Sequence, residues 1–281
     1  MTSLLLCGTG STGLAIAKLL RAADHPVILT SRTGKAPEPY KAATFDWLDH
    51  ATFENPFKED SNIDRVYIVS PTIYDMLPHA KAFIDLAITK GVKRFVLLSE
   101  SQLGPGDPYT GKIHEYLLEI GVDYFVLRPT WFTQNFGRYF YFSIREQNEI
   151  FSATGNGRIP WLSIDDLANL AFEALTAEKC PNKDSFIFGP ELYTYDEIAE
   201  IFTDVLGRKI THKKLTPTEF AQLFTTFGIT PVHADLLASM EQAVADGVEE
   251  GLFNSSPDKK YLGTYKLSDY IRENKELWIK E

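Results

Sequence analysis

A glycine-rich turn directly after a short apolar run is the feature that most constrains the fold of this chain. Residues 4–6 are all leucine, as expected of a buried strand, and residues 14–20 have the apolar spacing of a helix. Glycines between a strand and a helix permit a tight turn and a close approach to a phosphate, and the helix N-terminus offers free N–H groups. We therefore expect a dinucleotide-phosphate site made, in the pattern G-x-G-x-x-G, by Gly8, Thr9, Gly10, Ser11, Thr12 and Gly13.

The first half of the chain alternates short apolar runs with amphipathic segments. Further apolar runs stand at residues 27–29, 66–69, 95–98 and 125–127, and helical spacing stands near residues 76–89 and 113–120. Strands that are apolar throughout and are joined by helices are typical of a parallel sheet covered on both faces. The predicted fold class is α/β, a doubly wound parallel sheet of the Rossmann type, with residues 1–150 as the dinucleotide-binding domain.

The remaining part, residues 151–281, predicts a smaller, helix-rich α/β lobe that holds the substrate and is interleaved with the first domain. Two Thr-x-x-Glu stretches begin at Thr194 and Thr216, and each predicts a capping box at the start of a helix. Short strands are expected at residues 185–188 and 210–215.

The end of the second predicted strand indicates which dinucleotide is preferred. An Asp or Glu at this place accepts hydrogen bonds from the ribose 2′-hydroxyl of NAD. The sequence instead reads Thr30-Ser31-Arg32 and has no carboxylate there. The guanidinium of Arg32 can pair with a 2′-phosphate, and Ser31 lies next to it. The predicted cofactor is therefore NADPH (NADP).

Composition argues against several other classes of protein. The net charge of −10 disfavours a surface for nucleic acid or for an anionic membrane. The two cysteines, Cys7 and Cys180, are far apart, so we expect a cytoplasmic protein without a disulfide framework. The histidines are scattered without metal-ligand spacing, so no metal is predicted. Cys7 is expected to be a small buried residue beneath the phosphate loop.

Several short phrases follow one another along about three quarters of the chain. They include Phe45-Asp46-Trp47-Leu48-Asp49, Lys93-Arg94-Phe95-Val96-Leu97-Leu98-Ser99, Gly111-Lys112-Ile113-His114, Leu127-Arg128-Pro129-Thr130-Trp131-Phe132, Ser152-Ala153-Thr154 and Leu206-Gly207-Arg208-Lys209-Ile210-Thr211-His212. Through them the chain resembles the NmrA-like group of atypical short-chain dehydrogenases/reductases. Within that group it resembles the fungal ergot-alkaloid reductases.

The resemblance implies an extended Rossmann fold, the use of NADPH and reduction of a cyclic iminium to a tertiary amine. That reduction is the step that completes a tetracyclic ergoline. Carried over by position, the resemblance implies cofactor contacts from Asp46 near the adenine, from Ser70 and Pro71 beside the ribose, and from Thr130 near the nicotinamide. It implies catalytic positions at Ser99, Lys112 and Tyr109.

The chain departs from the family pattern at three places. Cys7 replaces a frequent glycine of the phosphate loop, and Glu100 replaces a small residue after Ser99. Pro108 stands where the pattern Tyr-x-x-x-Lys requires tyrosine, so that Tyr109 is displaced by one residue from the place four before Lys112. A ketone needs a proton donor when it accepts hydride, whereas an iminium becomes a neutral amine without one. The missing tyrosine therefore favours an iminium substrate.

A cationic, indole-derived substrate is suited to aromatic walls and to a carboxylate counter-ion. The counter-ion candidate is Glu100. The aromatic candidates for substrate contact are Tyr109, Trp131, Phe132, Phe136, Tyr139 and Trp161. The spacing of residues 131, 132 and 136 also suits a core-facing helix, so a purely structural role stays open for them.

Two other functions remain open on the sequence. One is an NADPH-dependent quinone or enone reductase, and the other is a non-catalytic NADP-binding, redox-sensing regulator of the NmrA-like type. Because a sensor needs no aromatic pocket, the cluster at residues 131–136 favours an enzyme acting on a small alkaloid. The sequence leaves open the oligomeric state and whether an upstream pathway enzyme is a partner that delivers the iminium.

Overall fold

The structure is a computed structural model, and it describes residues 1–71, 73–255 and 257–280. Contacts between Cα atoms divide the chain into two compact units. The first unit comprises Met1–Arg128 and Ile164–Ser185, and the second comprises Pro129–Ser163 and Phe186–Glu281. The chain therefore passes from one unit to the other three times, at residues 128/129, 163/164 and 185/186.

The main sheet has eight strands in the order β10-β8-β6-β5-β4-β1-β2-β3. Their bounds are β1 (Thr2–Leu5), β2 (Val27–Ser31), β3 (Lys41–Thr44), β4 (Ile63–Ile68), β5 (Arg94–Leu98), β6 (Asp123–Pro129), β8 (Lys183–Phe188) and β10 (Lys260–Leu262). The pairings from β3 through β6 are parallel, as is that of β8 with β10. Strand β1 lies between β2 and β4, where the strand order reverses, and this is where ligands bind in such sheets. The prediction of a doubly wound parallel sheet is confirmed.

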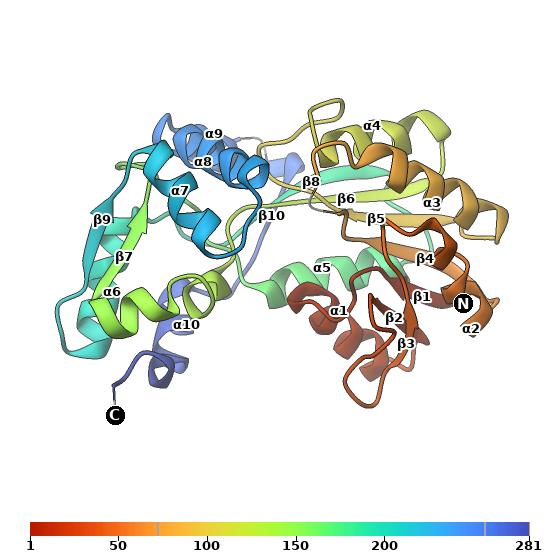
Figure 1. Cartoon of the computed structure of the whole chain (residues 1–281), viewed down its shortest axis with the longest axis horizontal. Helices are drawn as coiled ribbons and strands as arrows, with labels where there is room; N and C mark the ends of the chain where they lie inside the picture. Colours follow the sequence, from red (N-terminus) through yellow and green to blue (C-terminus); the bar gives the residue numbers. More distant parts are fainter. Residues whose placement is uncertain (72, 256, 281) are drawn as a thin grey trace. The chain divides into compact units, whose positions relative to one another are not determined.

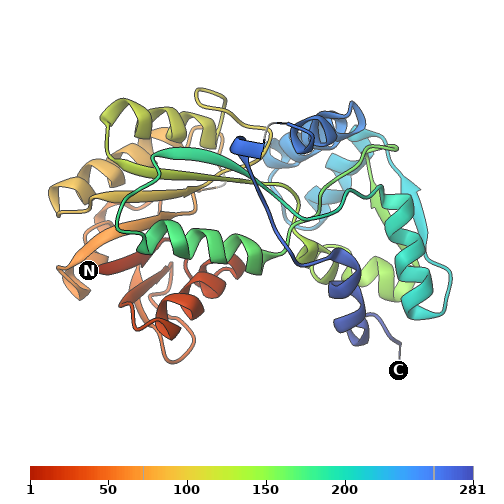
Figure 2. The ribbon, with the colours of Figure 1, turned by 180° about the vertical axis from the view of Figure 1, so that it is seen from behind.

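Helices cover both faces of the sheet in the first unit. Helices α1 (Ser11–Ala22) and α5 (Ile164–Thr176) pack against each other on one face, and α3 (Leu77–Thr89) and α4 (Thr110–Ile120) lie on the other (Figures 1 and 2). The short α2 (Asn55–Glu59) contacts β3. Buried aliphatic and aromatic side chains fill this unit, and strands β1, β4 and β5 are buried along nearly their whole length.

The second unit is built from helices around a two-stranded parallel sheet. The strands are β7 (Glu149–Ser152) and β9 (Thr211–Lys214), and the helices are α6 (Tyr195–Leu206), α7 (Pro217–Thr226), α8 (Pro231–Ala245), α9 (Val248–Phe253) and α10 (Leu267–Glu273). Short 3₁₀-helical segments of this unit occur at Thr133–Gly137, Pro257–Lys259 and Lys275–Leu277, and a π-helical segment occurs at Ser143–Gln147. The first unit has a 3₁₀ turn at His50–Thr52. Both predicted capping boxes are confirmed: the hydroxyls of Thr194 and Thr216 accept from the N–H groups of Glu197 and Glu219.

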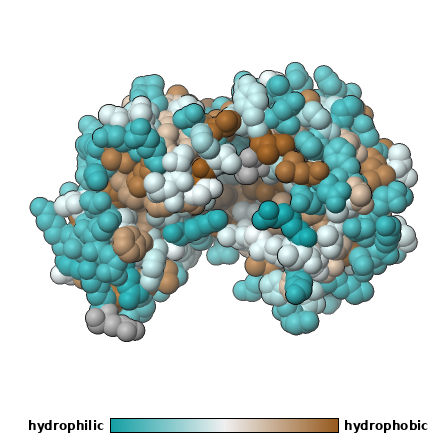
Figure 3. Space-filling view, in the orientation of Figure 1, coloured by the Kyte–Doolittle hydropathy of each residue, from teal (hydrophilic) through white to brown (hydrophobic). Residues whose placement is uncertain are grey.

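Polar side chains cover most of each unit on the face seen in Figure 3. Within the described part of the chain, no helix has the length and apolar character needed to cross a membrane. The same residues contain no group of three or more His, Cys, Asp or Glu side chains arranged to hold a metal ion.

Candidate functional site

The glycine-rich turn packs so tightly that two of its glycines have no room for a side chain. A Cβ atom on Gly8 would lie 2.6 Å from the carbonyl oxygen of Leu5, and one on Gly13 would lie 2.6 Å from the Cα of Gly8. Gly10 is the N-cap of α1, no side chain caps this helix end, and its first turn holds no acidic residue. The helix therefore presents its partial positive charge without a competing carboxylate.

Cys7 differs from the prediction of a small buried residue, because its side chain is exposed. Its φ of 51° lies in the left-handed region that favours glycine. The backbone N–H of Cys7 donates to the Thr30 hydroxyl at 3.0 Å, which joins the start of the turn to the end of β2. The thiol makes only a weak contact, 3.8 Å from the Val69 carbonyl oxygen.

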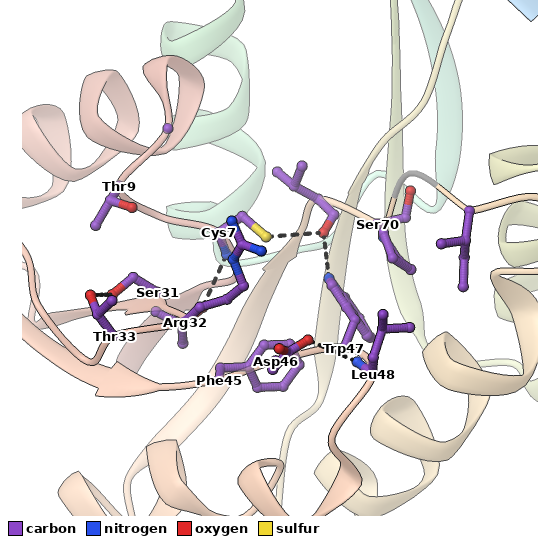
Figure 4. Close-up of a pocket in the computed structure, with 15 residues that line it drawn as sticks. Cys7, Thr9, Ser31, Arg32, Thr33, Phe45, Asp46, Trp47, Leu48 and Ser70 are labelled. Carbon is purple, nitrogen blue, oxygen red and sulfur yellow. Dashed lines mark hydrogen bonds between the residues drawn. The ribbon is translucent and has the colours of Figure 1, made fainter. Parts of the chain in front are cut away.

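A cavity of about 640 Å³ lies beside this turn, entirely within the first unit. Seven of the residues predicted to bind a cofactor line it, namely Thr9, Gly10, Ser31, Arg32, Asp46, Ser70 and Pro71. The other lining residues are Cys7, Thr30, Thr33, Phe45, Trp47, Leu48, Val69 and Ile73. Figure 4 shows them converging from the ends of β1, β2 and β4 and from the segment after β3. The predicted phosphate, ribose and adenine positions are thus brought together around one cavity.

The loop after β2 is fixed in a way that leaves its arginine exposed. The Ser31 hydroxyl accepts from the N–H of Lys35 at 3.0 Å and donates to the carbonyl oxygen of Lys35 at 2.8 Å, which closes the loop. Arg32 is exposed and lies next to Cys7 in the cavity (Figure 4). None of the ion pairs found among the described residues involves Arg32. The guanidinium is therefore placed to receive an anionic group.

The opposite wall of the cavity is held by a tryptophan that the sequence reasoning did not assign to the site. The Trp47 indole N–H donates to the Val69 carbonyl oxygen at 3.0 Å, and its ring packs edge-to-face on Phe45 at 5.0 Å. Asp46, between them, accepts from the N–H of Leu48 at 3.0 Å through Oδ1. Trp47 belongs to the sequence stretch at residues 45–49 that the family shares. Within that stretch, the family resemblance implied a cofactor contact for Asp46 alone.

Three polar side chains form a cluster after β5 and at the start of α4. The Ser99 hydroxyl lies 2.8 Å from that of Thr110, and both hydroxyls contact the Glu100 carboxylate. Burial raises the pKa of Glu100 above its usual value, while the two hydroxyls lower it. The two predicted site residues Ser99 and Glu100 thus share one polar cluster. Thr110 is a further member of this cluster that the sequence did not indicate.

Tyr109 and Lys112 lie at the start of α4. Tyr109 is the N-cap, with a φ of 62°, and its ring packs edge-to-face on Tyr74 at 5.6 Å. Lys112 is exposed on the first turn of the helix. Pro108 supplies no hydroxyl to accompany this lysine.

In the second unit, the segment after β6 carries Thr130, Trp131 and Phe132. The buried Thr130 hydroxyl donates to Glu249 at 3.0 Å, and the Trp131 indole N–H donates to Glu241 at 3.1 Å. Trp131 and Phe132 are both partly exposed.

The remaining aromatic candidates of the second unit differ in their exposure. Tyr139 is partly exposed and packs on Phe224 at 5.7 Å. Phe136 and Trp161 are 0% and 1% exposed, and their rings pack 4.6 Å apart in the core of this unit. In this structure these two rings contact other core side chains, so Trp131, Phe132 and Tyr139 are the ones open to a ligand.

Comparison with known proteins gives the relatives of the chain. It is 42% identical to agroclavine dehydrogenase of Claviceps fusiformis over 286 residues, which cover 99% of both chains. It is 38% identical to festuclavine synthase II of Penicillium roqueforti and 39% identical to festuclavine dehydrogenase of Aspergillus fumigatus, each over at least 99% of both chains. The chain belongs to this family of ergot-alkaloid dehydrogenases. No family model matches it.

The fold of this chain is also found in solved structures of low sequence identity. The NADP(H) complex of the triphenylmethane reductase of Citrobacter has a TM-score of 0.76 and 19% identity, with 97% of this chain and 99% of that chain covered. The NADPH complex of an Escherichia coli quinone oxidoreductase has a TM-score of 0.77 and 21% identity, with the same coverage. These likenesses show that the chain shares the fold of these two proteins.

Proposed function

We propose that the chain is an NADPH-dependent reductase that transfers hydride to a cyclic iminium of an ergot-type alkaloid intermediate. The assignment of NADPH rests on Arg32, which is exposed in the cavity at the end of β2, where the chain has no carboxylate. The names of the relatives, agroclavine dehydrogenase and festuclavine synthase, support the alkaloid part.

The residues around the cavity fit a dinucleotide with a 2′-phosphate. The tight glycine turn at Gly8 and Gly13 lets the backbone approach a pyrophosphate, and Arg32 suits the 2′-phosphate. Asp46, Ser70 and Pro71 line the part of the cavity assigned to the adenosine. When bound, NADPH supplies the hydride for the reduction.

The residues at the start of α4 favour an acceptor that needs no proton. An iminium carbon already carries positive charge, so hydride addition gives a neutral amine directly. Pro108 replaces the proton-donating tyrosine of the short-chain pattern. Reduction of a ketone needs such a donor, whereas reduction of an iminium does not. We propose that Ser99, Thr110 and Glu100 supply a polar, partly charged surface after β5, with Glu100 as a counter-ion for the cation.

The proposed activity is tested by following NADPH absorbance with purified protein and a panel of acceptors. The panel contains a tricyclic indole amino-aldehyde that cyclises to an iminium, simple cyclic imines, and quinones. Turnover confined to the iminium-forming compounds is expected. Turnover of quinones alone would replace the proposal by a quinone reductase, and cofactor binding without turnover would replace it by a sensor.

The cofactor preference is tested by Arg32→Ala. We expect the variant to lose most of its preference for NADPH over NADH, a change of about thirtyfold in the ratio of kcat/KM values, because one charged contact to a phosphate is removed. Arg21→Ala, which removes an exposed arginine from the other end of α1, is the matched control and is expected to leave the ratio unchanged. An unaltered preference in Arg32→Ala would contradict the assignment of the 2′-phosphate.

A further inference from the structure

A buried carboxylate of α8 holds the indole of Trp131. Glu241 is 1% exposed, and its two oxygens accept from different donors. Oε1 accepts from the Trp131 indole N–H at 3.1 Å, and Oε2 accepts from the backbone N–H of Ala153 at 2.9 Å. None of the ion pairs found among the described residues includes Glu241. The protein thus buries an acid here whose hydrogen-bond partners are both uncharged.

This hydrogen bond leaves the face of the Trp131 ring as the part that can meet a ligand. The indole packs against the core of the second unit and stays partly exposed. Its one polar group is already bound to Glu241, so it cannot donate to a substrate. What remains for recognition is the π-face, which attracts cations and flat aromatic groups.

The charge of Glu241 is sensitive to a cation nearby. Burial raises the pKa of Glu241 to about 8, and the hydrogen bonds from Ala153 and Trp131 oppose that rise. The titratable group that faces it from α6 is the Tyr195 hydroxyl, whose own pKa is raised well above 10 by burial and by Glu241. Near pH 7 the carboxyl is therefore largely protonated. A cation over the indole stabilises the ionised form, and an ionised acceptor on the N–H makes the ring face more electron-rich.

We propose that Glu241 is a specificity-determining residue that acts through Trp131, making the exposed face of this indole a binding surface for a flat, permanently cationic nitrogen heterocycle. This inference rests on the proposed function, since it states which substrate property the second unit recognises. Glu241 acts as a positioning residue, because it touches the indole and the backbone of Ala153.

The binding experiment uses the NADP⁺-saturated protein and a pair of matched ligands in a calorimeter. The cationic probe is a quaternary N,N-dimethyl tetrahydro-β-carbolinium, and the neutral probe is tetrahydrocarbazole, which has the same ring shape. Glu241→Gln keeps the size of the side chain but cannot ionise when the cation binds. We expect it to weaken binding of the cation about tenfold and to leave the neutral probe within about twofold, because only the cation gains from the electron-rich ring.

A second readout in the same experiment separates this role from a structural one. Titrations at pH 7 in phosphate and in Tris buffer, which differ in ionisation enthalpy, measure protons released on binding. The wild-type protein is expected to release a fraction of a proton when the cation binds, and Glu241→Gln is expected to release none. Trp131→Phe removes the N–H and is expected to lose the same cation preference, without further loss in the double variant.

Glu249→Gln is the matched control, since this buried carboxylate of α9 bonds the Thr130 hydroxyl instead of an indole. The proposal is overturned if wild type binds both probes equally, if Glu241→Gln weakens both alike, or if Glu249→Gln abolishes the cation preference equally. Failure of the proposed function is a separate result: the wild-type protein would prefer the cationic probe and release protons, yet reduce no iminium with NADPH.

Discussion

At the scale of single residues, the phosphate loop carries a conformational cost at Cys7. Non-glycine residues at positive φ crowd their Cβ against the backbone, at a cost of about 1–2 kcal/mol. The φ of 51° at Cys7 places it in this region, and the exposed side chain recovers only a weak contact to Val69.

Replacing Cys7 by glycine is therefore expected to stabilise the fold. The gain is about 0.5–1 kcal/mol in the free energy of unfolding, because relief of strain exceeds the added flexibility of the unfolded chain. Urea unfolding of Cys7→Gly measures it. Cys7→Ala keeps the positive φ and is expected to gain nothing, so equal stabilisation by alanine would show that strain is not the cause.

At the scale of elements, two buried arginines join the central sheet to the end of α5. Arg94 of β5 donates to the carbonyl oxygens of Ala174 and Ala177 at 3.0 and 2.6 Å. Arg65 of β4 donates to the carbonyl oxygen of Leu175. These carbonyls lie at or just beyond the C-terminus of α5, where a helix leaves such groups without internal partners and favours positive charge. The arginines thus fix a helix that is distant in the sequence onto the sheet.

Removal of this contact is expected to be costly. Arg94→Met is expected to lower the free energy of unfolding by about 2–4 kcal/mol, because it leaves buried carbonyl groups without donors. Chemical denaturation of the variant measures the loss. Lys93→Met, at the exposed neighbouring position, is the control and is expected to stay within about 0.5 kcal/mol of wild type. Similar losses in both variants would contradict this role of Arg94.

At the scale of the whole molecule, buried titratable groups oppose one another in their effect on stability. Burial lowers the pKa of His114, His212 and His233 below 6.5, so acid protonates the unfolded chain first and destabilises the fold below that pH. Burial raises the pKa of Glu100 and Glu241 above 4.5, so these carboxyls favour the fold at low pH and weaken it as the pH rises. We expect the free energy of unfolding to be largest between pH 4.5 and pH 6.5. The histidines lower it at more acidic pH, and the two carboxyls lower it at more alkaline pH.

The pH profile of Glu241→Gln isolates the contribution of one of these groups. Well below pH 4.5 the wild-type carboxyl is protonated in both folded and unfolded chains, so the substitution has its smallest electrostatic effect there. As the pH rises through about 8, wild type must bury a charge that glutamine lacks. The Tm of the variant is therefore expected to rise relative to that of wild type.

Thermal unfolding from pH 5 to pH 9 measures this gain. We expect the difference in Tm to grow by at least about 5 °C over that range, given the size of the chain. Glu250→Gln, which removes a partly exposed acid from the neighbouring α9, is the control. Parallel curves for Glu241→Gln and wild type would show that Glu241 keeps an ordinary pKa.

Those features of the protein that depend on near neighbours in the chain could be predicted from its sequence. Apolar runs predicted the strands at residues 27–29 and 95–98, the glycine turn predicted the start of α1, and Thr-x-x-Glu predicted two caps, because each depends on a few consecutive residues. The absence of a carboxylate after β2 is also visible in a few consecutive residues, so the sequence could indicate Arg32 as a contact for a 2′-phosphate.

Contacts between residues that are distant in the chain became visible in the folded structure. It placed α5 on the sheet through Arg65 and Arg94, and it left Cys7 exposed beside the cavity. It also brought Thr110 to Ser99 and buried Phe136 against Trp161. It also paired Trp131 with Glu241, 110 residues further along. Such pairings follow from packing and from the need of buried polar groups for partners, and neither leaves a periodic trace in the sequence.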